Sequence, residues 1–170
     1  MKKLLLFPSA ICLLICLNPF GTSYMFSQTT FQKTFGGTSA DYGYSVQQTA
    51  DGGFALAGQT SSFGAGNDDV YLIKTDSNGN TLWTKTFGGI IGYDEGYSVQ
   101  QTADGGFVVG GETNSFGAGN ADVYLIKTDS NGNTLWTKTF GGSGDDEGYS
   151  VQQTADGGFA LAGETYSFGA

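Results

Sequence analysis

The sequence has no histidine and no arginine, and its two cysteines, two prolines and two methionines all lie within the first 27 residues. After residue 27, the commonest side chains for acid–base and nucleophilic catalysis are therefore missing. Without cysteine, this part of the chain must be stabilised by packing and not by disulfide bonds. Arginine pairs with phosphate in a bidentate manner, so its absence disfavours nucleic acid as a partner.

Positive charge is also scarce after residue 27. All sixteen acidic residues lie in this region, opposed only by Lys33, Lys74, Lys85, Lys127 and Lys138. An acidic surface repels phosphate groups, so we expect neither nucleic acid nor an anionic membrane surface as a partner. Aromatic and aliphatic residues recur at regular intervals along the same region, which favours a folded chain over a disordered acidic one.

The first residues have the layout of a secretory signal peptide. Lys2 and Lys3 precede a short apolar run over 4–17, and a more polar stretch ending in small residues follows. The apolar run is too short to span a bilayer. We predict a signal peptide over 1–27, cleaved after Ser27 or alternatively after Ser23. The mature chain is then secreted or held at the cell surface, with no transmembrane segment.

Repetition dominates the rest of the chain. The string GYSVQQTADGGF occurs without change at 43–54, 96–107 and 148–159. The run VYLIKTDSNGNTLWTKTFGG, which starts at Val70, returns letter for letter at Val123. We place a repeat region at 28–170, with units at about 36–88, 89–141 and 142–170, the last one truncated.

Each unit is predicted to contain four short strands and no helix. Tyr44 and Val46 alternate with polar residues, as in a strand with one buried face. The Asp-Gly pair at 51–52 predicts a tight turn, because glycine accepts the positive φ that such turns need. VYLI is apolar on both faces, as in a strand covered on both sides. The predicted strands of the first unit are 44–49, 54–58, 70–75 and 81–87.

The sequence therefore predicts an all-β protein built from four-stranded antiparallel blades of a β-propeller. Middle strands that are apolar on both faces suit sheets that pack face to face. The small residues of 54–58 suggest that the second strand of each unit lies nearest the propeller axis. A β-solenoid is the structural alternative, but its coils are usually much shorter than these units.

From about Thr29 onward, the order D-x-G-Y-S-V, D-G-G-F, D-V-Y-L-I-K-T-D-x-x-G-N and L-W-x-K-T-F-G-G resembles the β-propeller repeat proteins secreted by bacteria and archaea, with kelch-like blades. The segment D-x-x-G-N-x-x-W (76–83) is also similar to blades of quinoprotein-type propellers. The resemblance implies a blade type. It implies no cofactor, since no quinone-site residues are identified, and such families have mixed functions.

The phase of the repeats suggests an incomplete ring. Residues 29–35 match the fourth strand TLWTKTF, two whole units follow, and the third unit supplies only its first two strands. This amounts to about 2.5 blades plus an N-terminal closing strand, whereas a propeller needs roughly four to eight blades. We expect a fragment of a longer protein. The alternatives are several copies that assemble one ring, or self-association through exposed blade faces.

Sequence variation between units collects in the loops at one end of the strands. Gln59, in the first unit, is replaced by Glu112 and Glu164 in the other two, and most of the acids lie at this loop end. If the protein binds a protein or a glycan, we expect it to do so here. The predicted binding residues are Asp41, Tyr42, Asp68, Asp69, Tyr93, Asp94, Glu95, Asp122, Asp145, Asp146 and Glu147.

The loop residues are compatible with more than one kind of ligand. Clustered carboxylates suggest Ca²⁺ or a cationic partner, with a solvated acidic surface as the plainer interpretation. DSNGN resembles the start of a calcium loop, but a tight β-turn fits better because glycine comes too early. Trp83 and Trp136 are interpreted as core residues rather than sugar-stacking platforms. Tyr166 is a further loop aromatic with possible ligand contact.

No catalytic residues are predicted. Near-identical repeats present the same chemistry several times, whereas an active site needs different groups in different roles, although a pair of carboxylates of glycosidase type stays open. The leading hypothesis is a non-catalytic, exported β-propeller used for binding or scaffolding. The alternative is the propeller portion of a larger secreted enzyme, such as a polysaccharide hydrolase.

Overall fold

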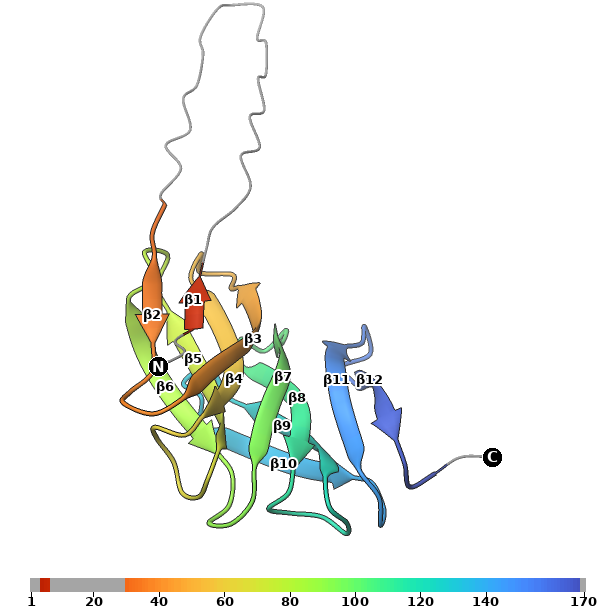
Figure 1. The fold of residues 1–170 in the computed structure, drawn as a ribbon. Helices are drawn as coiled ribbons and strands as arrows, with labels where there is room; N and C mark the ends of the chain where they lie inside the picture. The colour runs from red at the N-terminus through yellow and green to blue at the C-terminus, as the bar shows by residue number, and fades with distance from the viewer. Residues whose placement is uncertain (1–3, 7–29, 169–170) are drawn as a thin grey trace, which may run out of the picture.

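The computed structural model describes residues 4–6 and 30–168, with side chains from 30 onward (Figure 1). Within these ranges all regular structure is β-strand, and every strand pair is antiparallel. No helix in these ranges is long and apolar enough to cross a membrane. The predicted all-β class and the repeated four-stranded unit are therefore confirmed. The predicted leader-cleavage position, Ser27, lies outside the described residues.

Two complete sheets follow the chain order. The first contains β3 (Asp41–Gln48), β4 (Phe54–Thr60), β5 (Asp69–Thr75) and β6 (Thr81–Phe87). The second contains β7 (Asp94–Gln101), β8 (Phe107–Thr113), β9 (Asp122–Thr128) and β10 (Thr134–Phe140). The third sheet has only β11 (Asp146–Gln153) and β12 (Phe159–Thr165). A separate pair joins β1 (Leu4–Leu6) to β2 (Lys33–Phe35), with Leu4 opposite Phe35 as Val70 is opposite Phe87.

Local sequence explains the tight turns that connect the strands. Gly52 has φ of 81° and Gly79 has φ of 74°, in the left-handed region that glycine accepts readily. Asp76 closes its turn by accepting the backbone N–H groups of Asn78 at 2.9 Å and Asn80 at 2.8 Å. The interpretation of both segments as tight turns is confirmed.

A buried lysine ties the first turn of each complete sheet to its third strand. Lys74 is 5% exposed, and its ammonium group donates to Asp51 at 2.8 Å and to the carbonyl oxygen of Thr75 at 2.8 Å. Lys127 repeats the arrangement with Asp104 at 2.9 Å. The ammonium groups therefore enter the sheet ends with their hydrogen-bonding capacity used, which makes their burial tolerable.

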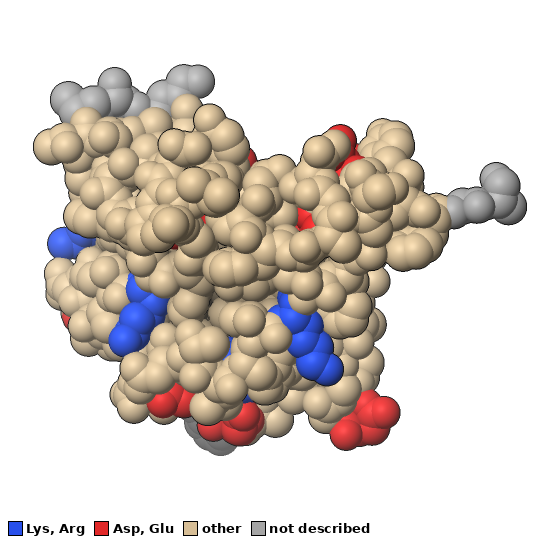
Figure 2. Space-filling view, turned by 90° about the horizontal axis from the view of Figure 1, so that it is seen from below, with Lys and Arg blue, Asp and Glu red and all other residues tan. Residues whose placement is uncertain are grey.

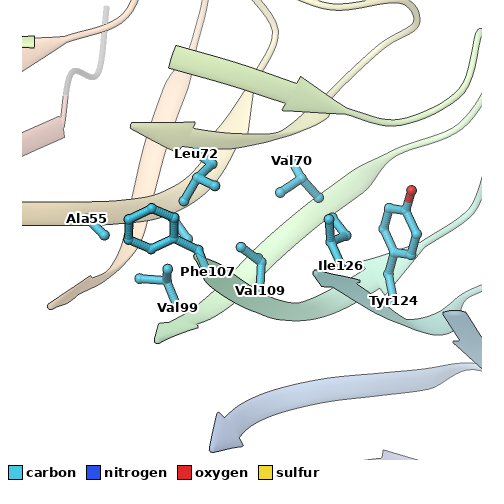
Figure 3. Packing of buried hydrophobic residues seen from close by; sticks show 9 residues of the cluster. Ala55, Val70, Leu72, Val99, Phe107, Val109, Tyr124 and Ile126 are labelled. Atoms are coloured by element: carbon cyan, nitrogen blue, oxygen red, sulfur yellow. The ribbon is translucent and has the colours of Figure 1, made fainter. Parts of the chain in front are cut away.

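The sheets pack face to face, as Figure 3 shows for the first and second sheets. We call the side of a sheet that meets the next sheet along the chain its forward face, and the opposite side its backward face. The forward face of the first sheet contributes Ala55, Ala57, Val70 and Leu72. The backward face of the second contributes Val99, Phe107, Val109 and Ile126. The second sheet covers one side of β5, and Phe31 and Phe35 pack on the other side. The first and third sheets cover the two sides of β9. Both strands are therefore buried along their whole length, as predicted from VYLI.

One aromatic pair recurs at every junction. The ring of Phe107 lies edge-on to Trp83 at 5.6 Å, and Phe159 lies edge-on to Trp136 at 5.7 Å. Phe54 meets Phe31, just before β2, in the same way at 5.7 Å. The prediction that the two tryptophans are packing residues is confirmed, since both are partly buried against core clusters.

The innermost strands are the first strands of the sheets. β3 contacts β7, and β7 contacts β11, while the later strands of each sheet lie progressively outward (Figure 1). The prediction that the second strand is innermost is wrong. Its small residues make room for the adjacent sheet instead, because a Cβ atom on Gly110 would lie 3.1 Å from the Cβ atom of Val151.

Most predicted strand limits were too short at the loop end. The first strand begins at Asp41 and not at 44, and the second continues to Thr60. Polar residues extend these strands because their side chains are bonded there, such as the Thr60 hydroxyl, which donates to the buried Asp41 carboxylate. Residues 81–87 form β6 as predicted, whereas the N-terminal strand is limited to Lys33–Phe35.

Candidate functional site

The loop end of the sheets contains buried carboxylates that hold the loops in place. Asp94 is fully buried, and it accepts the backbone N–H of Gly89 at 3.0 Å and the hydroxyl of Thr113. Asp41 and Asp146 have the same role in their own repeats, where they accept the N–H groups of Gly37 and Gly142 at 2.9 Å. These three predicted site residues thus organise the loops from below and present little carboxylate to solvent.

Asp69 and Asp122 are a second buried pair of predicted site residues. Asp69 accepts the N–H of Ala65 at 2.9 Å, and Asp122 accepts that of Ala118 at 2.9 Å. Burial raises the pKa of Asp69, and the neighbouring Asp94 carboxylate contributes in the same direction. Their geometry shows structural anchoring of the loops between the second and third strands, and a ligand-binding role stays a prediction.

The other predicted residues lie nearer the surface. Tyr93 is 51% exposed, and Asp145 is exposed at a loop tip. Tyr42 is half-buried and stacks on Tyr44 with ring centroids 6.4 Å apart. Asp68 accepts the side-chain N–H of Gln59 at 2.8 Å. On the face in Figure 2, lysine side chains lie between acidic side chains at opposite edges of the view.

Three tyrosines on the innermost strands bring part of this set together. Tyr44, Tyr97 and Tyr149 occupy the same position in β3, β7 and β11. The ring centroids of the first two are 5.3 Å apart, and those of the last two are 5.7 Å apart. We call these rings, together with the adjacent carboxylates of Glu95, Glu112, Glu147 and Glu164, the tyrosine–carboxylate row.

Hydrogen bonds connect the tyrosine hydroxyls to the acids. The Tyr149 hydroxyl lies 2.7 Å from an oxygen of Glu147 and 2.7 Å from an oxygen of Glu164. One phenolic proton serves only one of these carboxylates at a time. In the first repeat the glutamate is replaced by Gln59, and Tyr44 donates to its side-chain oxygen. The second and third sheets therefore each contribute two carboxylates to the row, whereas the first sheet contributes none.

The pKa values in the row follow from this crowding of acidic groups. Burial, followed by the negative charge of Glu147, raises the pKa of Glu112 to about 7. Burial also raises the pKa of Glu95, against the opposing effect of hydrogen bonds from Tyr44 and Tyr97. The pKa of Tyr149 is raised because its hydroxyl is bonded to Glu164 and Glu147. The row thus contains one carboxyl group, that of Glu112, with a pKa of about 7, and phenols whose raised pKa values keep them protonated.

The raised pKa of Glu112 predicts a pH-dependent stability. The folded protein favours the protonated carboxyl, so its contribution is complete below the ordinary pKa of 4.5 and is lost as the pH rises through about 7. We expect Glu112→Gln to unfold at a higher urea concentration than the wild type at pH 8, with a much smaller difference at pH 4. The first repeat already has glutamine at this position.

The measurement is urea unfolding of both proteins from pH 4 to pH 8, followed by far-UV circular dichroism. Asp145→Asn is the control, since it removes an exposed carboxylate from the same loop end. Parallel curves for the wild type and Glu112→Gln across this range would show that Glu112 titrates as an ordinary surface carboxylate.

The tyrosines of the row were not among the site residues predicted from the sequence. They belong to the invariant string, which is read as scaffold when one repeat is considered alone. An aromatic residue at one position of every innermost strand, close to a variable acid, was the available signal. Of the predicted residues, Glu95 and Glu147 join the row, while Asp41, Asp69, Asp94, Asp122 and Asp146 lie beneath the loops.

The described residues include no group of three or more acidic side chains arranged to hold a metal ion. The carboxylates instead pair with hydroxyls and backbone N–H groups of the same loops. No protein-family model matches the chain, and no curated protein sequence matches it.

Proposed function

We propose that the chain is a non-catalytic, exported repeat protein whose sheets are blades of a β-propeller, and that it binds a cationic segment of another protein at the tyrosine–carboxylate row. The observation that supports this most strongly is the row itself. Equivalent tyrosines from three adjacent sheets lie side by side with tilted rings, whose centroids are 5.3 and 5.7 Å apart, beside partly exposed carboxylates.

The arrangement of the sheets supports the propeller. Four-stranded antiparallel meanders pack face to face, with their first strands adjacent and their last strands outermost (Figure 1). Blades of a propeller have this arrangement around a central axis. Since such rings contain roughly four to eight blades, a closed ring needs more strands than the described residues supply.

The chemistry of the row fits a cation. Tyrosine faces attract ammonium and guanidinium groups, and carboxylates pair with the same groups. The row presents a tyrosine three times and a pair of carboxylates twice, so contacts along an extended lysine-rich segment add through effective concentration. A neutral glycan would stack on the rings and donate hydroxyl hydrogen bonds to the carboxylates, but its binding would not use their negative charge.

Export is part of the proposal because the first 27 residues have the composition of a signal peptide. Cleavage after Ser27 removes β1 from its pairing with β2, so the mature chain begins at the segment that leads into β2. N-terminal sequencing of the exported protein tests this directly. A mature protein that starts at residue 1 would contradict it.

A second candidate function is a role in a larger secreted hydrolase. The observation that favours it is Glu112, whose pKa of about 7 is typical of a general acid. The leading proposal predicts no hydrolysis of nitrophenyl glycosides by the full chain. Hydrolysis that disappears in Glu112→Gln would favour the hydrolase instead.

The test of the leading proposal is calorimetric titration of the full chain with a lysine-rich peptide. We expect binding that weakens as salt is added, because the partners are oppositely charged. Tyr149→Ala removes a ring that is 46% exposed, and we expect it to weaken binding roughly 2- to 30-fold. Tyr166→Ala, which removes an exposed tyrosine outside the row, is the control and should bind as the wild type does.

A glutamate-rich peptide of the same length should not bind. Binding of both peptides would show nonspecific association. Equal binding by the wild type and Tyr149→Ala would refute the assignment of the row.

A further inference from the structure

We propose that two copies of the chain dock head to tail, with the backward face of the first sheet of one copy covering the forward face of the third sheet of the other. This inference rests on the proposed reading of the sheets as propeller blades and deepens it by naming the partner of the exposed blade faces. The three repeats contain the same string in different surroundings, so a residue buried in one repeat and exposed in another marks a face without a covering sheet.

The exposed face of the first sheet is shown by one valine. Val46, Val99 and Val151 occupy the same position in the invariant string. Val99 and Val151 are each 6% exposed, because the preceding sheet covers them, whereas Val46 is 51% exposed. None of the described residues covers Val46 as the other two valines are covered. The innermost strand β3 therefore presents the surface that β7 and β11 bury.

The complementary face lies on β12. Ala55 and Ala57 on β4 are 0% and 1% exposed, because the second sheet packs on them. Their equivalents on β12, Ala160 and Ala162, are exposed. At the corresponding place on β8, a Cβ atom on Gly110 would meet Val151 at 3.1 Å, so this small-residue position receives the valine of the next sheet. Ala162 thus lies at the position on β12 against which Val46 of another copy would pack.

Hydrogen bonds across the internal junctions give the same direction. Ser45 accepts the backbone N–H of Val99 at 3.2 Å, and Ser98 accepts that of Val151 at 3.2 Å. The Gln47 and Gln100 side chains accept the N–H groups of Gln101 and Gln153, each at 2.5 Å. In both junctions side chains on the first strand of the earlier sheet accept backbone N–H groups of the later sheet. A glutamine of the later sheet accepts in return from the turn of the earlier one, as Gln101 does from Ala50 at 2.9 Å and Gln153 from Ala103 at 2.8 Å.

The two free ends continue this pattern. Ser150 and Gln152, on β11, are the next acceptors in the series, and among the described residues no following sheet supplies donors for them. The N–H groups of Val46 and Gln48, on β3, are the matching donors. Head-to-tail docking brings these acceptors and donors together in the same arrangement as at the two internal junctions.

The N-terminal segment occupies the position of a fourth strand in the same series. Phe31 meets Phe54 as Trp83 meets Phe107, and Lys33 donates to Asn80 at 3.1 Å as Lys85 donates to Asn133 at 3.1 Å. β2 therefore takes the fourth-strand position of the sheet whose first two strands are β11 and β12 of the other copy. Each copy then contributes two complete sheets and shares two junction sheets, so two copies close a ring of about six blades, within the usual range.

A groove beside β12 lies where β2 of the other copy would pack. It is lined by Leu125, Trp136, Lys138, Phe140 and Phe159, together with the turn glycines Gly157 and Gly158. Phe140 is 51% exposed here, while its equivalent Phe87 is partly buried against the second sheet. The third and fourth strands of the second sheet fill the equivalent space beside Trp83.

The test is sedimentation equilibrium of the full chain and of variants at the two faces. We expect a mass of two copies for the wild type. Val46→Arg and Ala162→Asp each place a charge at the junction, and we expect each to raise the dimer Kd at least about 100-fold. Leu135→Arg, at an exposed position on β10, is the control and should remain dimeric. Circular dichroism verifies that every variant keeps its strand content.

Mixing the two faulty variants adds a directional test. A Val46→Arg copy and an Ala162→Asp copy still form one junction from two unchanged faces, so the mixture should regain dimers that neither variant forms alone. A monomeric wild type, or an Ala162→Asp variant that dimerises normally, would overturn head-to-tail docking. Peptide binding by the row, measured also in the monomeric Ala162→Asp variant, succeeds or fails independently of this result.

Discussion

Phe107→Ala should lower the free energy of unfolding by about 3–5 kcal/mol, the usual cost of removing a large aromatic side chain from a packed core. Phe107 is 1% exposed and belongs to the cluster between the first and second sheets (Figure 3). Its ring contacts Trp83 edge-on, so truncation leaves a cavity on both sides of the junction. Urea denaturation followed by tryptophan fluorescence measures the loss.

Phe159→Ala is the matched control, because Phe159 ends the same invariant string in the third repeat. It meets Trp136 in the same geometry but is only partly buried, since the third sheet has just two described strands. We expect it to cost less than half as much as Phe107→Ala. Both variants are measured in an Ala162→Asp background, which keeps the chain monomeric. Equal costs would contradict the packing described for the two sheets.

Asp94→Ala should have a comparable effect, about 3–5 kcal/mol, although it removes a charged side chain at the loop end. The Asp94 carboxylate is fully buried and accepts the Gly89 N–H and the Thr113 hydroxyl. Alanine leaves these buried donors without an acceptor, and each unsatisfied group costs about 1–3 kcal/mol. Urea denaturation at pH 7 measures the change.

Two further variants serve as comparisons for Asp94→Ala. Asp145→Ala removes an exposed carboxylate of the same loop end and should change stability by no more than about 0.5 kcal/mol. Asp94→Asn keeps an oxygen acceptor and should fall between the two. A stability unchanged in Asp94→Ala would mean that this aspartate is a solvated loop residue, as its sequence alone suggests.

Local features of the fold were predictable because their causes are local. The Asp-Gly turn needs only the positive φ of Gly52, and β5 is identified by an apolar stretch that requires cover on both sides. Which strand of each sheet contacts the first strand of the next sheet was not predictable. Ala57 is small because Val99 of another sheet packs in this region, and no pattern within one repeat contains that contact.

The site was partly predictable for a similar reason. The predicted acidic loops lie at the end of the sheets at which Glu95 and Glu147 meet the tyrosines. The roles of Asp41 and Asp94 depend on burial by loops from distant parts of the repeat, which charge patterning does not reveal. The tyrosine–carboxylate row forms only when adjacent sheets bring Tyr44, Tyr97 and Tyr149 together.

The central claim is that identical strings differ because of the sheets beside them, and amide hydrogen exchange tests it most directly. The backbone N–H groups of Val46, Val99 and Val151 have the same neighbours in sequence, so their intrinsic exchange rates are equal. In the monomeric Ala162→Asp variant, we predict that Val99 and Val151 exchange at least about tenfold more slowly than Val46, because Ser45 and Ser98 accept their N–H groups. Equal rates at the three valines would contradict the account.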